Sequence, residues 1–321
     1  MDKAYVTFKI PRKGLDLLSE GYRVEINPLE KPVSRKWLLE HGQNYSAFIT
    51  MLHDTIDQEV LDVMKGHVKI IANYAVGYNN IDIEHAARCG ITVTNTPDVL
   101  TNATAEIAFA LMLSVMRRIV EGDRYVREGL FEMWKPELLL GEETAGKTVG
   151  ILGMGRIGRS FAKKCFGFDM KILYHNRNRL APEDEVATHA KYVDFETLLA
   201  ESDVISIHLP LTPQTKHLFT LETFQKMKRS AFLINTGRGP VIKENDLLKA
   251  LKTGLIKGAG LDVYEAEPKV TEGLLELSQT VLLPHIGSGS VKARETMSEM
   301  VARAALDVLR GKTPEHMVAG P

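Results

Sequence analysis

The sequence predicts an α/β protein with two domains, each built on a parallel sheet. Short β-branched apolar runs alternate with stretches of helical spacing almost from end to end. A glycine-rich turn joins one of these runs to the helical stretch that follows it. The chain has 321 residues, enough for two domains with separate cores. We therefore expect two sheets, with a cleft between the domains.

The first hundred residues contain four apolar runs that predict strands. They are "AYVTF" (4–8), "YRVEI" (22–26), "SAFIT" (46–50) and "VKIIANY" (68–74). Helical spacing lies between them, over residues 13–20 and 57–64. Strands of this kind, joined by helices, favour a parallel sheet that is covered on both faces.

A second series of six apolar runs predicts the second sheet. They are "TVGILG" (148–153), "KILYH" (171–175), "VISIHL" (204–209), "AFLIN" (231–235), "GAGLDV" (258–263) and "TVLLP" (280–284). Between the two series, "IAFALMLSVM" (107–116) is apolar on nearly all faces. It reaches about half of a bilayer span. We expect a buried helix there, which could also serve a subunit interface.

The domain boundary is expected near "NTPDVLTNATAE" (95–106), where a loop leads into a Thr/Asn-capped helix. A final helix over about residues 291–310 would return the chain to the first domain. We therefore predict a discontinuous substrate domain of residues 1–99 and 286–321. The dinucleotide-binding domain would span residues 100–285, and the two crossings would form a hinge.

Composition narrows the function classes. The net charge is −1, so no overall field attracts nucleic acid or an anionic membrane. The two cysteines, Cys89 and Cys165, lack the CxxC spacing of a zinc site and cannot build a disulfide framework, so no metal is expected. The first residues are too interrupted for a signal peptide. These features predict a cytoplasmic protein.

The turn "TVGILGMGRIGRS" carries the dinucleotide fingerprint. Gly153, Gly155 and Gly158 follow an apolar strand and open a helix, which is the context that GxGxxG requires. Gly153 permits the tight turn, and Gly155 leaves the pyrophosphate free to approach the helix N-terminus. Gly158 lets the helix pack closely on the sheet.

The next strand end, "LYHNRNRL", bears on the choice of cofactor. Sites for NAD usually carry an acid there, which binds the ribose 2′-hydroxyl. This chain has Asn176, followed by Arg177 and Arg179. Since an arginine fork pairs with a 2′-phosphate, this arrangement favours NADP(H), with NAD(H) as the alternative. Both arginines could instead be solvated strand-end residues.

Three later strand ends carry polar residues. Arg238 lies in "INTGRGP", Asp262 and Glu267 in "GAGLDVYEAEP", and His285 in "LLPHIGSGS". Ligands of open parallel sheets bind at the carboxyl ends of the strands, so these side chains should lie on the dinucleotide side.

With "GMGRIG" before them, these motifs resemble, in order, the D-isomer-specific 2-hydroxyacid dehydrogenase family. The resemblance covers essentially the whole chain, including "NYAVGYNNIDIEHAARCGITVTNTP". It is strongest to glyoxylate/hydroxypyruvate reductases, partly through "MWKP" and the basic strand end. A homodimer and a small 2-oxo or 2-hydroxy acid as substrate are implied.

The resemblance also implies residue roles. Arg238 would bind the substrate carboxylate, with help from the N–H groups of Val76 and Gly77. His285 would be the acid/base and Glu267, which directly precedes a proline, its partner. Trp134 would reach the partner subunit's site. Cofactor contacts are expected from Thr104, Gly153, Gly155, Arg156, Ile157, Gly158, Asn176, Arg177, Asn178, Leu209, Pro210, Thr215, Thr236, Gly237, Arg238, Asp262, His285 and Gly287, with Asp262 at the nicotinamide carboxamide.

The chemistry agrees with these roles. Arginine offers a planar, permanently charged fork to a carboxylate. Histidine can donate a proton near neutral pH, and a neighbouring carboxylate favours its protonated form. The predicted reaction is therefore the reduction of a small 2-oxo acid to the D-2-hydroxy acid.

Alternatives stay open. One is a broader D-2-hydroxyacid dehydrogenase, or a phosphoglycerate-type enzyme, that uses NAD. A formate dehydrogenase fits less well, because that branch pairs its histidine with glutamine. From another class comes an NAD(H)-sensing protein similar to the co-repressors of this fold, against which the near-neutral charge argues.

Overall fold

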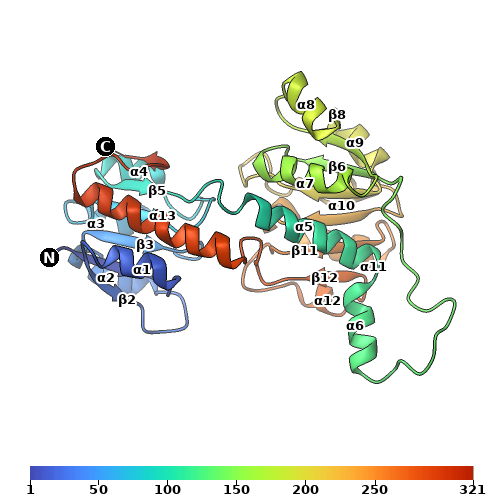
Figure 1. Ribbon diagram of the computed structural model, residues 1–321, viewed down its shortest axis with the longest axis horizontal. Coiled ribbons are helices and arrows are strands. Elements are labelled where there is room, and N and C mark those ends of the chain that lie inside the picture. Colours follow the sequence, from blue (N-terminus) through green and yellow to red (C-terminus); the bar gives the residue numbers. More distant parts are fainter. Residues whose placement is uncertain (321) are drawn as a thin grey trace. The chain divides into compact units, whose positions relative to one another are not determined.

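The computed structural model describes residues 1–320 and divides into two compact units. Unit 1 consists of Met1–Leu100 and the segment that begins at Gly289, and unit 2 is Thr101–Ser288 (Figure 1). The predicted boundaries, 99/100 and 285/286, lie one and three residues from these positions. Both units are α/β, and the prediction of two parallel-sheet domains is confirmed.

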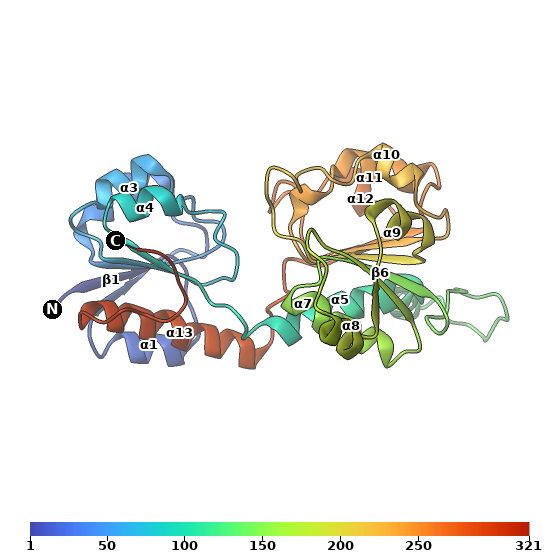
Figure 2. The same cartoon turned by 90° about the horizontal axis from the view of Figure 1, so that it is seen from above.

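Unit 1 contains a six-stranded sheet in the order β13-β5-β4-β3-β1-β2. The strands are β1 (Lys3–Val6), β2 (Arg23–Ile26), β3 (Ala47–Thr50), β4 (Ile70–Asn73), β5 (Thr92–Thr94) and β13 (Met317–Ala319). All neighbours pair in parallel except β13, which runs antiparallel to β5. Helices α1 (Arg12–Leu18) and α13 (Val291–Leu309) cover one face, and α3 (Gln58–Met64) and α4 (Ile83–Arg88) cover the other (Figure 2).

Several helices of unit 1 begin with a short polar side chain. Ser34 caps α2 (Arg35–His41), which packs on α3, by accepting the N–H of Trp37. Asp57 and Asp82 do the same for α3 and α4. Such caps satisfy N–H groups that have no partner within the helix. The segment Gly42–Asn44 adds one turn of 3₁₀ helix (η1) after α2.

The return of α13 to unit 1 depends on a close helix contact. A side chain at Gly14 of α1 would place its Cβ 2.3 Å from the carbonyl oxygen of Ser298 on α13. The Gly14 N–H donates to Ser298 Oγ at 3.2 Å. Glycine is therefore needed where the two helices touch.

Unit 2 contains a seven-stranded sheet, parallel throughout, in the order β12-β11-β10-β9-β6-β7-β8. The strands are β6 (Thr148–Leu152), β7 (Lys171–His175), β8 (Ala190–Tyr192), β9 (Val204–Ile207), β10 (Phe232–Asn235), β11 (Gly258–Leu261) and β12 (Thr280–Leu282). Strand order reverses between β6 and β9, so the switch point lies beside the glycine-rich turn.

Helices cover both faces of this sheet (Figure 2). On one face lie α5 (Thr101–Met116), α7 (Arg156–Phe166) and α8 (Pro182–Thr188). On the other lie α9 (Phe195–Glu201), α10 (Leu221–Gln225), α11 (Glu244–Lys252) and α12 (Glu272–Leu275). The apolar residues of α5 pack against α7, β10 and β11, so the expectation of a buried helix is confirmed.

A long excursion separates α5 from β6. Helix α6 (Ile119–Arg127) and the loop of residues 128–147 project from the rest of unit 2 (Figure 1). Their exposed large apolar side chains are Ile119, Val120, Val126, Leu130, Phe131, Met133, Trp134 and Leu140. Among residues 1–320, no helix is both long and apolar enough to cross a membrane.

Candidate active site

His285 is paired with Glu267. It follows β12 by three residues in a left-handed backbone conformation, with φ of 54°. Its Nδ1 lies 2.7 Å from Oε2 of Glu267, whose Oε1 accepts the N–H of Tyr264 at 3.0 Å. Burial raises the pKa of Glu267, but the hydrogen bond and charge of His285, the Tyr264 N–H and the charge of Arg238 outweigh it, and the pKa lies below its usual value.

The pairing determines which nitrogen of the imidazole can act on a substrate. An ionised carboxylate only accepts hydrogen bonds, so Nδ1 carries the proton that points at Glu267. The Nε2 atom of His285 has no hydrogen-bond partner among residues 1–320. It is the atom from which a proton can pass to a ligand, or return.

Asp262 fixes the backbone next to His285. It directly follows β11 and is only 1% exposed. Its two oxygens accept the N–H groups of Ile286 and Gly287, each at 2.7 Å. Burial raises the pKa of Asp262, and these hydrogen bonds and the charge of His285 offset the effect in part. The carboxylate therefore holds the turn that carries the imidazole, and its role at a nicotinamide stays a prediction.

Arg238 lies on a loop organised by a buried asparagine. Asn235, the last residue of β10, donates from Nδ2 to the carbonyl of Arg238 at 3.0 Å. Its Oδ1 accepts the N–H of Gly237 at 3.0 Å. Burial lowers the pKa of the Arg238 guanidinium, and the charge of Glu267 acts in the opposite direction. The cation thus shares its surroundings with the carboxylate that bonds His285.

The Arg238 and Glu267 loops touch directly. A Cβ at Gly239 would lie 1.7 Å from the carbonyl oxygen of Tyr264, so only glycine fits. Arg238, Asp262 and His285 follow the carboxyl ends of β10, β11 and β12, which are neighbours in the sheet. A fixed cation and an imidazole tied to a carboxylate can together bind an anion and move a proton.

The glycine turn has the shape that a pyrophosphate needs. Gly153 has φ of 99°, and a Cβ there would lie 2.8 Å from the backbone of His208. A Cβ at Gly158 would meet the carbonyl oxygen of Gly153 at 2.2 Å. A Cβ at Gly155 would meet no atom within 4 Å, so the space in front of the N-terminus of α7 is open to a ligand.

The two arginines that follow β7 differ in their contacts. Arg179 is held by Glu185 through two contacts of 2.8 Å. Arg177 is exposed and makes no hydrogen bond or ion pair with any residue in 1–320. The side chain of Asn176 is hydrogen-bonded within the protein. Its Oδ1 accepts the N–H of Met154 at 2.6 Å and so connects the strand end to the glycine turn. Of the two, Arg177 is the arginine whose side chain is open to a ligand, and its role at a 2′-phosphate stays a prediction.

Threonines near these loops also bear on cofactor binding. The Oγ1 of Thr236 is buried and has no hydrogen-bond partner among the described residues. Thr104 of α5 is buried, and a Cβ at Gly287 would lie 3.3 Å from its methyl group. Thr215 donates to the carbonyl of Pro210 at 2.7 Å and closes that loop. An orphaned hydroxyl and an open glycine cradle fit a bound dinucleotide.

The remaining predicted residues of unit 2, except Trp134, lie at or just after the ends of strands. Arg156 and Ile157 form the first turn of α7, Asn178 is exposed after β7, and Leu209 lies beside Gly153. Trp134 is 77% exposed on the loop between α6 and β6.

In unit 1, the loop with Val76 and Gly77 has its own buried asparagine. Asn73, the last residue of β4, donates to the carbonyl of Gly77 at 2.9 Å. Asn95 donates to the carbonyl of Val76 at 2.8 Å. The N–H groups of Val76 and Gly77 donate no hydrogen bond within residues 1–320. They are thus available to an anion.

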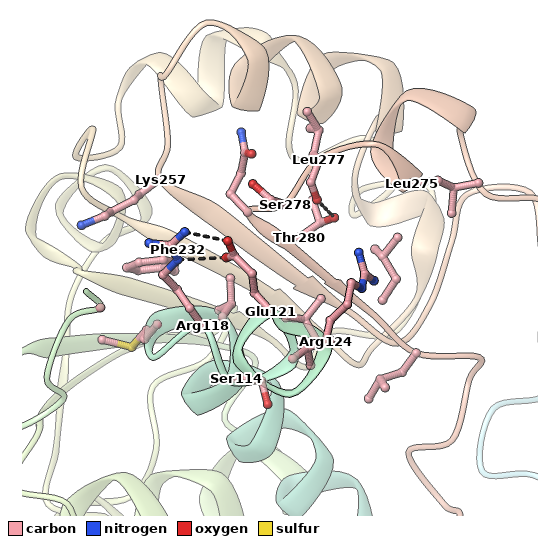
Figure 3. Close-up of a pocket in the computed structure, with 18 of the residues that line it drawn as sticks. Ser114, Arg118, Glu121, Arg124, Phe232, Lys257, Leu275, Leu277, Ser278 and Thr280 are labelled. Atoms are coloured by element: carbon pink, nitrogen blue, oxygen red, sulfur yellow. Dashed lines mark hydrogen bonds and ion pairs between the residues drawn. The ribbon is translucent and has the colours of Figure 1, made fainter. Parts of the chain in front are cut away.

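A cavity of about 570 Å³ lies elsewhere in unit 2, along the edge strand β12 and helix α6 (Figure 3). The ion pair of Arg118 and Glu121 forms part of its wall. None of the predicted catalytic or cofactor residues lines it. The residues at the strand ends that are candidates for catalysis and cofactor binding therefore lie outside this cavity.

Asp62, His85 and Cys89 on α3 and α4 bring possible metal ligand atoms within 4.8 Å of one another. His85 Nε2 lies 2.7 Å from Asp62, and the Arg88 guanidinium lies 3.0 Å from Nδ1. Both ring nitrogens are engaged, and the group is arranged as an ion-pair network.

Three organising residues were not predicted from the sequence: Asn73, Asn235, and Glu244, which accepts the N–H of Glu265 and the hydroxyl of Thr271. The asparagines end the strands "IIAN" and "FLIN", and a polar residue at the end of an otherwise apolar strand is a signal that could have identified them. Glu244 carries no such signal, because a glutamate in the first turn of a helix is ordinary.

Known proteins resemble this chain over almost its entire length. Residues 109–287 match the family model described as D-isomer specific 2-hydroxyacid dehydrogenase, NAD binding domain. A glyoxylate reductase of Thermococcus litoralis is 48% identical, with 98% of this chain and 96% of that protein covered. Among solved structures, a glyoxylate reductase from Paecilomyes thermophila is 34% identical, with a TM-score of 0.88 and coverage of 99% and 98%. An NADPH-dependent glyoxylate/hydroxypyruvate reductase from Sinorhizobium meliloti, solved with NADP and malonate, is 30% identical, with a TM-score of 0.86 and coverage of 99% and 97%.

Proposed function

The chain belongs to the D-isomer-specific 2-hydroxyacid dehydrogenase family, as an NAD(P)-dependent oxidoreductase that acts on 2-oxo acids, and we propose that its substrates are glyoxylate, hydroxypyruvate or acids of similar size. The product is the D-2-hydroxy acid wherever the new centre is chiral. The observation that carries the proposal is the His285–Glu267 pair beside Arg238, at the same sheet edge as the open glycine turn.

Each residue has a definite task in this reaction. Arg238 binds the substrate carboxylate, and its charge fixes the orientation of the 2-oxo group. The nicotinamide cofactor, when bound, supplies the hydride. Protonated His285 gives its Nε2 proton to the oxygen on which negative charge develops, and Glu267 stabilises the imidazolium. Asp262 holds the turn so that Nε2 stays in place.

Val76 and Gly77 remain candidates for carboxylate binding. Their N–H groups make no hydrogen bond within the described chain, which supports the role that the resemblance implies. Two such donors suit a carboxylate oxygen, because an N–H pair aimed at an anion gives charge-assisted hydrogen bonds.

NADPH is the proposed physiological donor, with NADH as the weaker alternative. The end of β7 presents Asn176 in place of an acid, and the exposed Arg177 has no partner among residues 1–320. A 2′-phosphate there would meet a cation and no carboxylate. The Sinorhizobium meliloti relative, described as NADPH-dependent, agrees with this preference.

The enzyme is further proposed to be a homodimer that uses the excursion of residues 119–140. Eight large apolar side chains are exposed on it. An exposed apolar surface of this kind is typical of a protein–protein interface. Sedimentation velocity should show a dimer, and replacing Phe131 and Leu130 by aspartate should yield monomers. A wild-type monomer at micromolar concentration would contradict the proposal.

The test of the function is a screen of small 2-oxo acids with both cofactors. Glyoxylate and hydroxypyruvate should give the highest kcat/KM, and NADPH should be oxidised faster than NADH. A preference for larger acids with NADH would favour the broader dehydrogenase. Tight cofactor binding without turnover of any 2-oxo acid would favour the sensor.

A further inference from the structure

We propose that Glu244 and Glu265 form a clasp that positions Glu267 against His285, so that both act as positioning residues for proton transfer. The inference rests on the proposed reductase function and assigns the roles of two carboxylates that do not themselves face a substrate. Their hydrogen bonds connect the segment that follows Arg238 with the loop that carries Glu267.

Glu244 holds the Glu267 loop on both sides. It is the first residue of α11 and is only 4% exposed. Its Oε1 accepts the N–H of Glu265, two residues before Glu267. Its Oε2 accepts both the N–H of Thr271 at 3.2 Å and the Thr271 hydroxyl at 2.7 Å. One buried carboxylate thus anchors the loop before and after Glu267.

Glu265 returns the contact. Its Oε2 accepts the N–H of Glu244 at 2.9 Å, and its Oε1 lies 2.6 Å from Nε2 of His217. Each glutamate therefore accepts the backbone N–H of the other, in the manner of a capping box but between segments 21 residues apart. Hydrogen bonds to ionised carboxylates are about twice as strong as neutral ones.

The clasp also fixes the segment that follows Arg238. Gly239–Val241 forms a short 3₁₀ helix, η2, that leads toward Glu244. The N–H of His217 donates to the carbonyl of Pro240 at 2.8 Å, and the N–H of Lys243 donates to the carbonyl of Phe219 at 3.0 Å. Together with the close contact of Gly239 and Tyr264, these hydrogen bonds fix the position of the Arg238 loop relative to the Glu267 loop.

Loss of the clasp should impair proton transfer by His285 and leave cofactor binding unchanged. Within residues 1–320, the glycine turn, Asn176 and Arg177 make no hydrogen bond to Glu244 or Glu265. Without the clasp, the Glu267 loop gains freedom, and the 2.7 Å contact with His285 is populated for less of the time. Arg238 and Asp262 are the other charged groups that face this pair, and neither replaces the lost carboxylate contact.

The experiment compares Glu244→Gln and Glu265→Gln with Glu272→Gln, an exposed glutamate beside Thr271. For both clasp variants we expect a fall in kcat of about tenfold, equivalent to ~1.4 kcal/mol, with cofactor Kd within about twofold of wild type. The low-pH decline of reduction should shift to higher pH, because a looser contact with His285 lowers the pKa of Glu267 less. Glu272→Gln should match wild type in every measurement.

A double variant separates positioning from general stability. If the clasp acts through Glu267, then Glu244→Gln combined with Glu267→Gln should be no slower than Glu267→Gln alone, because coupled effects are not additive. Glu265 is 31% exposed, so Glu265→Gln carries the same test if Glu244→Gln does not fold. Full additivity, or an unchanged kcat and pH profile in folded variants, would overturn the clasp.

The proposed function can fail separately. If wild-type protein reduces no 2-oxo acid, the function is wrong, and the NMR signals of the His285 ring still test the clasp. They should change in Glu244→Gln in the same direction as in Glu267→Gln. Unchanged signals would refute positioning by Glu244 whatever the substrate is.

Discussion

The Nδ1 atom of His285 lies 2.7 Å from the Oε2 atom of Glu267, although the two residues follow different strands of the sheet. The contact leaves Nε2 as the ring nitrogen that is open to a ligand, and it lowers the pKa of Glu267.

Replacing Glu267 by glutamine should lower kcat and remove the low-pH decline of reduction. The pKa of Glu267 is depressed, so its stabilising charge is present above that value and is lost as the pH falls through it. Glutamine does not titrate and gives His285 no charged partner at any pH. Glu267→Gln should therefore be slow throughout and should lack the low-pH decline of the wild type. A wild-type kcat and pH profile in the folded variant would remove Glu267 from the pair.

Arg238→Lys should weaken substrate binding more than it slows chemistry. An ammonium is a point charge and cannot match the two oxygens of a carboxylate as the planar guanidinium does. We expect KM for the 2-oxo acid to rise about tenfold or more, equivalent to ~1.4 kcal/mol, with KM for the cofactor little changed. Steady-state kinetics measure both. Wild-type values of KM and kcat would exclude Arg238 from the site.

Two glycines of one turn should respond differently to alanine. In Gly153→Ala the new Cβ would lie against the backbone of His208 at a φ of 99°, so the free energy of unfolding should fall by about 2 kcal/mol or more. In Gly155→Ala the Cβ meets no protein atom, so stability should stay within about 1 kcal/mol while cofactor Kd rises about tenfold. Thermal unfolding and cofactor titration measure the two effects. Equal cofactor affinity in Gly155→Ala and wild type would place the pyrophosphate elsewhere.

The two arginines after β7 provide a matched pair for cofactor choice. Arg177→Ala should reduce the preference for NADPH over NADH by about tenfold or more, as expected for the loss of a charge-assisted hydrogen bond. Arg179→Ala should change the preference less, because Glu185 already holds that side chain. The ratio of kcat/KM for the two cofactors is the measurement. The reverse order would show that Arg179 leaves Glu185 to bind the phosphate.

Sequence patterns predicted the main strands because long apolar runs bounded by turns are a local signal. They did not predict β5, β8 and β13, because these three-residue strands lie outside the longer apolar runs, and their pairing comes from neighbours in space. The equally short β12 lies within the apolar run "TVLLP" and was predicted. The antiparallel β13 comes after the return helix, and its partner β5 lies more than 200 residues earlier in the chain.

Site residues at strand ends were predictable for a similar reason. Parallel strands bring Arg238, Asp262 and His285 to one edge, so their position in the motif suffices. The clasp of Glu244 and Glu265 could not be predicted in this way, because it depends on which backbone N–H groups the fold places opposite two ordinary glutamates. The hydrogen bond from the Met154 N–H to Asn176 could not be predicted for the same reason, because it depends on how the fold places two loops next to each other.

The central claim is that His285 donates the proton in the NADPH-dependent reduction of a small 2-oxo acid. It is tested most directly by following NADPH oxidation with glyoxylate for the wild-type enzyme and for His285→Ala. We expect turnover by the wild type and a loss of kcat of about 10²- to 10⁴-fold in the variant, with cofactor affinity retained. A folded His285→Ala enzyme that turns over at the wild-type rate would contradict it.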